Sequence, residues 1–138
     1  MNNAPLSASN PIASLNCLRG NYVRVEWKPV GATDEQLRAV YAQVLLFMKA
    51  HRAPRVLSDH RRRPPLSGAI QQWLREAWIP LAIREAGYSH CAIVESSNLM
   101  VRQAARAIGS SAPTALTTGY FEVPEQAEVW VEQFAAPV

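Results

Sequence analysis

The sequence is short of the residues and segments that would point at once to a class of protein. Only two of its 138 residues are cysteines, Cys17 and Cys91, and they lie far apart. This is too few for a disulfide framework, so we expect two reduced core thiols. The longest apolar run, VLLFM, has five residues, against about twenty for a membrane span. No targeting segment is visible either, and we expect a cytoplasmic protein that makes no membrane contact.

Motifs that would carry catalysis are also scarce. The chain has no glycine-rich phosphate loop, no dinucleotide fingerprint and no nucleophile elbow. His60 follows Asp59 directly, and adjacent side chains on a strand point in different directions. His90 and Cys91 are also adjacent, which is not a metal-ligand spacing. The fold could still bring a Ser, a His and an Asp together into a catalytic arrangement, and that alternative stays open. We nevertheless expect no enzyme, no cofactor and no metal.

The composition is that of one globular domain. Hydrophobic residues make up 49% of the chain and charged residues 18%, which is outside the range of disordered proteins. The net charge of +3 is too mild to imply nucleic acid. We expect residues 1–12 to form a flexible tail and residues 13–138 to form the domain.

The hydrophobic pattern predicts two strands and then alternating helices and strands. Val23, Val25 and Trp27 alternate with charged residues, which is typical of a half-buried strand. Pro80 interrupts a helical pattern and predicts a kink or a break there. Expected strands cover 13–18, 22–28, 55–59, 88–94 and part of 114–121. Expected helices cover 34–52, 67–86, 96 or 97 to 108, and a segment from 124.

This order of elements predicts an α/β fold. A leading hairpin followed by strands that alternate with helices favours a mostly parallel mixed sheet with one antiparallel edge. We expect about five strands packed with about four helices.

The chain resembles the STAS domain and the related SpoIIAA-like proteins. The likeness covers residues 13–138. It rests on the leading hairpin, on LSDHR before a tryptophan-rich helix, on GYSHCAIVES, and on the closing GYFEVPEQAEVWVEQF. The resemblance implies a compact regulatory domain that acts through a protein partner or as a homodimer, with no chemistry of its own.

In switching members of that family, an acid at the end of the third strand is followed at once by hydroxyl residues, one of which is phosphorylated. Asp59 matches the acid, but His60 and Arg61 stand where the hydroxyls belong. The nearest Ser-Gly is Ser67-Gly68. The resemblance therefore implies Ser67 as the phosphoacceptor only if residues 60–66 are an insertion, and a serine at that place is ordinarily a helix cap.

A second hypothesis is a ligand site at one edge of the sheet. Ligands of open α/β sheets bind outside the carboxyl ends of the strands, where Asp59 and the segment 95–98 should emerge. Guanidinium groups, hydroxyls and helix amides are suited to bind an anion. A run of arginines such as 61–63 is, however, often only a solvated surface segment. The candidate ligand-binding or partner-binding residues are Asp59, Arg61, Arg62, Ser96, Ser97 and Asn98. We thus expect a protein-interaction domain or, alternatively, a domain that binds a small anion or a lipid-like ligand.

Overall fold

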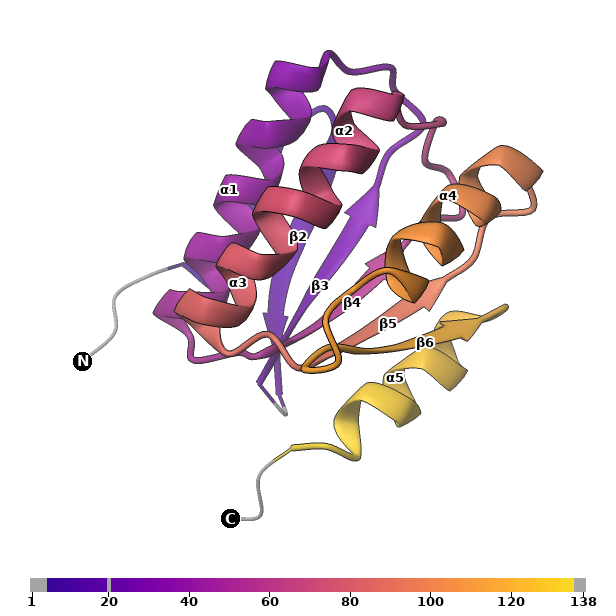
Figure 1. The fold of residues 1–138 in the computed structure, drawn as a ribbon. Coiled ribbons are helices and arrows are strands. Elements are labelled where there is room, and N and C mark those ends of the chain that lie inside the picture. Colours follow the sequence, from indigo (N-terminus) through magenta and orange to yellow (C-terminus); the bar gives the residue numbers. More distant parts are fainter. Residues whose placement is uncertain (1–4, 20, 136–138) are drawn as a thin grey trace.

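The computed structural model describes residues 5–19 and 21–135. It has three layers, with a central sheet, α1 to α4 on one face and α5 on the other (Figure 1). The strands are β1 (Ser7–Ser9), β2 (Ala13–Leu18), β3 (Tyr22–Trp27), β4 (Arg55–Asp59), β5 (His90–Val94) and β6 (Thr117–Phe121). The helices are α1 (Asp34–Ala50), α2 (Gly68–Trp73), the π-helical turn η1 (Leu74–Trp78), α3 (Ile79–Ala86), α4 (Leu99–Ser110) and α5 (Pro124–Glu132).

The six strands lie in the sheet in the order in which they occur in the chain. β1 pairs with β2, and β2 with β3, in antiparallel fashion, whereas β3, β4, β5 and β6 run parallel to one another. The predicted α/β class, the leading hairpin and the mixed, mostly parallel sheet are therefore confirmed. The carboxyl ends of the four parallel strands meet at one edge, as in other open α/β sheets.

Strand residues alternate between two separate cores. On β4, Leu57 packs toward α5, together with Ala127 and Val131. Its neighbour Val56 faces α1 to α4, where the larger core contains the buried Trp27 and Trp78. Because side chains two apart on a strand share a face, Ser58 points into this larger core. A polar side chain therefore lies among the apolar ones, and it positions the site described below.

The expected flexible tail is wrong for part of its length. Ser7–Ser9 forms β1, which pairs with β2 in the register Ser7 to Asn16, and residues 1–4 lie outside the described residues. The cause is a tight turn at Asn10. Its side-chain oxygen accepts hydrogen bonds from the amides of Ile12 and Ala13, which reverses the chain onto β2 as Asx turns do. This turn adds the sixth strand.

The kink expected at Pro80 takes the form of a widened helical turn. Pro80 has no amide to donate to the carbonyl of Glu76, and its ring crowds that carbonyl. The amide of Ile79 instead bonds to the carbonyl of Leu74, five residues back. The segment from α2 to α3 therefore continues without a break, and Gly87 ends it with a φ of 66°. π-helical turns of this kind are frequent at functional sites.

The start of α1 and the length of the helices also bear on the sequence-based expectations. The predicted capping box is confirmed, since Thr33 and Gln36 exchange side-chain and backbone hydrogen bonds at the start of α1. Across the described ranges, no helix combines the length and the hydropathy that a bilayer span requires.

Candidate functional site

The predicted site at Asp59 is occupied by a neighbouring side chain. Arg61 donates from Nε and Nη2 to both carboxylate oxygens of Asp59, at distances of 2.8 to 3.3 Å, and its backbone amide donates as well. Burial raises the pKa of Asp59, but the hydrogen bonds from Arg61 outweigh burial and the net shift is downward. Asp59 is therefore an ionised, paired carboxylate that holds the start of the loop.

The two halves of the predicted edge site do not share a pocket. A depression of about 500 Å³ lies beside Asp59, Arg61 and the exposed Arg62, and its other wall comes from the ends of β2 and β3. Ser96, Ser97 and Asn98 do not line it. They follow β5, whose last residue, Val94, is in register with Asp59. The structure thus places both groups at the same edge of the sheet without joining them.

The segment 96–98 serves the start of α4. The expectation that Ser96 or Ser97 caps this helix is wrong, because Asn98 is the cap and accepts from the amides of Met100 and Val101. Ser96 is buried, and its hydroxyl accepts the amide of Asn98. Only Ser97 keeps an exposed side chain with no role in this turn. The polar groups of Ser96 and Asn98 are used by the chain itself.

Ser67 caps α2, as its position predicted. Its hydroxyl oxygen accepts the amide of Ile70 at 3.1 Å. The hydroxyl also donates to Oδ1 of Asp34, at the start of α1, at 2.8 Å. Both hydrogen-bonding roles of this hydroxyl are therefore filled, and a carboxylate stands where a phosphate would be added. Phosphorylation of Ser67 stays a prediction.

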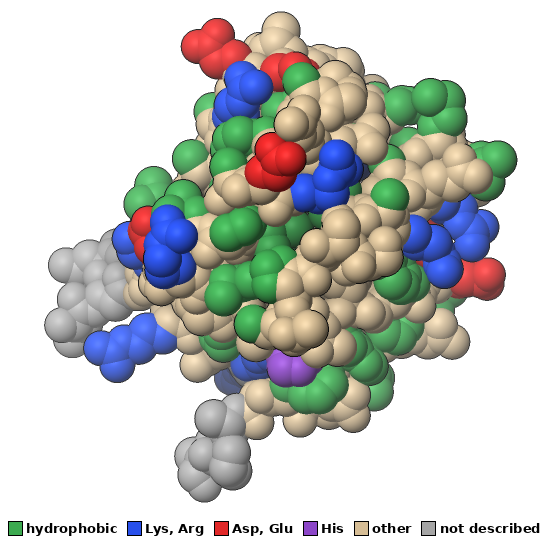
Figure 2. Space-filling model, viewed as in Figure 1, with side chains coloured by type: hydrophobic (Ala, Val, Ile, Leu, Met, Phe, Trp, Pro, Cys, Tyr) green, Lys and Arg blue, Asp and Glu red, His purple; other side chains and the backbone are tan. Residues whose placement is uncertain are grey.

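A largely apolar pocket lies inside the larger core. It is a cavity of about 80 Å³ between the sheet, the segment from α2 to α3, and α4. Its walls are almost entirely aliphatic and aromatic side chains, and Figure 2 shows hydrophobic side chains reaching the surface between the helices of this face. Both Leu74 and Trp78 of the π-helical turn line it. The wider turn at η1 thus belongs to the wall of the cavity.

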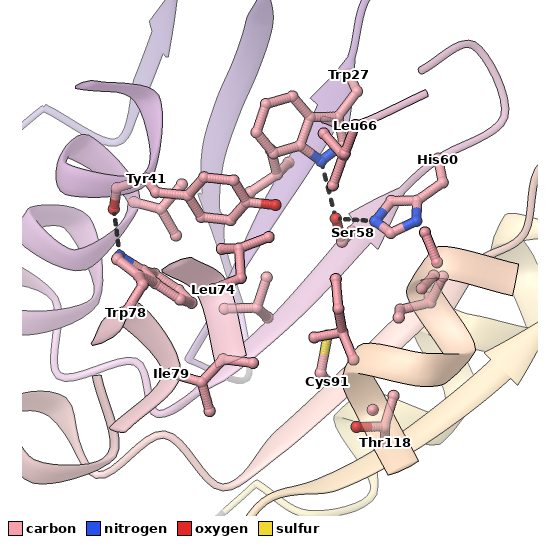
Figure 3. Close-up of a pocket in the computed structure, with 18 of the residues that line it drawn as sticks. Trp27, Tyr41, Ser58, His60, Leu66, Leu74, Trp78, Ile79, Cys91 and Thr118 are labelled. Carbon is pink, nitrogen blue, oxygen red and sulfur yellow. Dashed lines mark hydrogen bonds between the residues drawn. The ribbon is translucent and has the colours of Figure 1, made fainter. Parts of the chain in front are cut away.

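A chain of hydrogen bonds enters this apolar cavity from the sheet. The indole N–H of Trp27 donates to Oγ of Ser58 at 2.9 Å, and Oγ lies 2.8 Å from Nε2 of His60 (Figure 3). Because the Trp27 donor occupies a lone pair of Oγ, the Ser58 hydroxyl can donate its proton to Nε2. Nη1 of Arg63 also approaches Nε2, at 3.5 Å, and arginine can only donate. Nε2 is therefore the acceptor, and the ring proton of His60 is on Nδ1.

Burial fixes the charge of His60. The side chain is 6% exposed, and burial, with the nearby charge of Arg63 second, holds the pKa of His60 well below its ordinary value. The ring is therefore neutral at physiological pH. Its Nδ1–H is buried and has no hydrogen-bond partner within the described residues.

Arg63 is the second polar group of the cavity, and it is buried as a cation. Only 5% of the residue is exposed, and its guanidinium lies 3.7 Å from the ring centroid of Trp27 and 5.5 Å from that of Tyr41. None of the ion pairs found in residues 5–19 and 21–135 includes Arg63. Its Nε and Nη2 are buried without a hydrogen-bond partner there. Buried charges in proteins are normally paired, so this arrangement is unusual.

The remaining polar groups of the cavity wall are neutral. Burial raises the pKa of the Cys91 thiol to about 11, so it is protonated near pH 7 and is not an activated nucleophile. Burial likewise raises the pKa values of Tyr41 and Tyr88. Both cysteines are free thiols, as expected. The part of the chain that the structure describes contains no group of three or more His, Cys, Asp or Glu side chains that could hold a metal.

Sequence reasoning missed His60 and Arg63 as members of one site. The alternation along β4 could have found His60, because Ser58 and His60 are two residues apart and share a face. Arg63 carries no such signal, since it lies in a loop and its neighbours Arg61 and Arg62 point elsewhere. Three successive arginines have different surroundings: one pairs with Asp59, one is exposed and one is buried.

Comparisons with protein-family models, with curated proteins and with solved structures found no match to this chain. The likeness to STAS domains therefore stays a prediction.

Proposed function

We propose that this protein is a non-enzymatic domain that binds a small, largely apolar molecule in the cavity between the sheet, α2–α3 and α4. The observation that carries the proposal is a cavity of about 80 Å³ whose largely apolar lining includes His60 and Arg63, two residues with buried N–H groups that have no hydrogen-bond partner within the described residues. Ligand sites have this composition, with mostly hydrophobic walls and a few polar groups that fix orientation.

The size of the cavity limits the ligand. A dry protein cavity of about 150 Å³ accommodates benzene, so 80 Å³ suits a body of a few carbon atoms. The side chains that α4 contributes to the cavity are small or branched: Val101, Ala104, Ala105 and Ile108.

The protonation states in the cavity favour binding over catalysis. The Cys91 thiol, with a pKa of about 11, is not a nucleophile near neutral pH. His60 uses Nε2 as a hydrogen-bond acceptor and presents only an N–H donor. These groups can hold a ligand in position. Ser58 and His60 form a hydroxyl–imidazole pair, but Nδ1 of His60 has no hydrogen-bond partner within the described residues, whereas nucleophilic catalysis needs a base that a third group orients.

The test is ligand-dependent thermal stability with a matched pair of α4 variants. Small acids, amides and alcohols are screened for an increase in Tm, since a ligand at a hundred times its Kd stabilises by about 2.7 kcal/mol. Ala105→Leu fills the cavity, because Ala105 is buried and lines it, whereas Ala107→Leu changes an exposed site on the same helix. We expect at least one compound to raise the Tm of the wild type and of Ala107→Leu, but not of Ala105→Leu. No shift with any compound, or equal shifts in both variants, would overturn the proposal.

A second candidate function is regulation through a protein partner, as the STAS-like resemblance implies. It is favoured by the aliphatic pair Leu99 and Met100, which are 65% and 68% exposed on the first turn of α4. Because α4 also lines the cavity, a ligand in the cavity and a protein bound at this turn would contact the same helix. Hydrogen exchange of α4 with and without a cavity ligand tests the link. Unchanged protection of 99–110 on ligand binding contradicts it.

A further inference from the structure

The unpartnered atoms of Arg63 form one edge of its guanidinium. Nε and Nη2 lie on the same side of the group and present two nearly parallel N–H bonds, and neither has a partner within the described residues. Nη1, on the other side, is directed at His60. A fork of two N–H donors matches the two oxygens of a carboxylate.

The same chain uses this edge for carboxylates at two other places. Arg61 binds Asp59 with Nε and Nη2, and Arg106 binds Glu95 with Nε and Nη2 at 2.8 and 2.7 Å. In both pairs the carboxylate belongs to the protein. At Arg63 the corresponding donors are buried and meet no carboxylate of the described residues, and Arg63 is one of the residues that line the apolar cavity.

The surroundings of Arg63 hold the cation without neutralising it. The face of Trp27 lies against the guanidinium, whereas the ring centroid of Tyr41 lies farther away, at 5.5 Å, and the Tyr41 side chain also interacts with Arg63. Aromatic side chains attract a cation but carry no net charge. Nη1 of Arg63 lies 3.5 Å from Nε2 of His60, and the ring offers a further donor at Nδ1. The polar part of the cavity is thus rich in donors and positively charged, whereas the rest is apolar.

We infer that the ligand of this cavity is a small organic carboxylate, whose two oxygens bind Nε and Nη2 of Arg63 and whose short apolar body fills the space under α4. This inference rests on the proposed function, because it names the chemical class of the ligand that the cavity binds. A neutral molecule of the same shape leaves the guanidinium edge without an acceptor.

The experiment compares three probes of similar size: butyrate, butyramide and propylphosphonate. Their Kd values are measured by titration calorimetry with the wild type, with Arg63→Lys and with Arg62→Gln. Lys keeps the charge but cannot form the fork, and Arg62→Gln removes a charge from an exposed neighbour in the same loop. We expect butyrate to bind the wild type at least about tenfold more tightly than butyramide, because charge-assisted hydrogen bonds are stronger than neutral ones. This preference should be kept in Arg62→Gln and lost in Arg63→Lys.

A second measurement needs no variant and therefore does not depend on the folding of Arg63→Lys. The NMR signal of the Arg63 Nε–H should move when butyrate is added and should stay in place with butyramide. Equal affinities for butyrate and butyramide, or tighter binding of the phosphonate, would overturn the carboxylate inference while leaving the cavity as a ligand site. Failure of all three probes to bind, together with no Tm shift in the wider screen, would overturn the proposed function as well.

Discussion

The guanidinium of Arg63 lies over the indole of Trp27, 3.7 Å from the ring centroid, and the same indole donates its N–H to Ser58. One side chain of β3 therefore supports a buried cation and also begins the hydrogen-bond chain that reaches His60. The rings attract the cation through their quadrupole, which leaves its charge available to an anion. A cation buried without a carboxylate is costly to the fold, and this cost is the main reason for assigning Arg63 to a ligand.

Replacing Arg63 with methionine should make the protein more stable. Methionine keeps an unbranched chain against Trp27 and Tyr41 but removes the buried donors that have no partner among residues 5–19 and 21–135. We expect the free energy of unfolding to rise by about 1 kcal/mol, because replacing a buried charged group with an apolar one of similar volume often stabilises a protein. Urea denaturation measures the change. Arg62→Met, at an exposed position, should change it by less than about 0.5 kcal/mol. A loss of more than about 1 kcal/mol on Arg63→Met would show that Arg63 mainly stabilises the fold.

Removing the hydroxyl of Ser58 should destabilise the fold. In Ser58→Ala, the N–H of Trp27 loses its acceptor and Nε2 of His60 loses its hydroxyl donor, and both groups are buried. Buried groups left unsatisfied cost about 1 to 3 kcal/mol, and we expect a loss of about 2 kcal/mol in urea denaturation. Ser97→Ala, on the exposed loop before α4, is the control and should be close to neutral. Equal effects of the two substitutions would contradict the hydrogen-bond chain.

The neutral state of His60 predicts a pH dependence of stability. The pKa of His60 is lowered in the folded protein, so the unfolded chain takes up a proton near its ordinary pKa of about 6.5 while the folded chain does not. Stability due to His60 is therefore complete above that pH and falls as pH is lowered, by up to about 1.4 kcal/mol per pH unit.

The comparison that isolates this effect is wild type against His60→Gln between pH 7 and pH 5. The wild type should lose stability more steeply as pH falls. His90, whose pKa burial also lowers, contributes to both proteins alike and cancels in the difference. Parallel curves for the two proteins would mean that His60 is not held neutral in the cavity.

A negative charge at Ser67 should act against Asp34. The Ser67 hydroxyl donates to Asp34 at 2.8 Å, so Ser67→Asp keeps a good N-cap but sets two carboxylates against each other. We expect Ser67→Asp to cost about 0.5 to 1 kcal/mol in the wild type and little in Asp34→Asn, with the difference measured as a double-mutant cycle. Additive effects would contradict the repulsion. A phosphate at Ser67 would meet the same carboxylate with a larger charge.

Sequence patterning determined the fold more fully than the site, for a physical reason. The alternation of Val23, Val25 and Trp27 and the capping box at Thr33 are local signals, and each predicted its element correctly. β1 escaped prediction because it has only three residues, two of them serines, and because it pairs only after the turn at Asn10. Strand pairing across such a turn depends on the hydrogen bonds of the Asn10 side chain, and hydrophobic periodicity gives no information about these bonds.

The site depends on where a loop directs its side chains, and loops have no period. Arg61 and Arg63 are alike in the sequence, yet one closes on Asp59 and the other stacks on Trp27. The edge site predicted at Asp59 assumed that Asp59, Arg61 and Asn98 present free polar groups, whereas the groups that bind a ligand best are those that the chain leaves unpaired. Identifying these groups requires the hydrogen-bond partners, which only the structure supplies.

The most direct test of the account is a crystal structure with a carboxylate that carries a heavy atom, such as 3-bromopropionate, with the bromine located by anomalous scattering. We expect a bromine peak inside the cavity, between Val101 of α4 and Leu74 of η1, and the carboxylate on Nε and Nη2 of Arg63. A peak in the depression beside Asp59, Arg61 and Arg62, or no ordered bromine at saturating ligand, would contradict it.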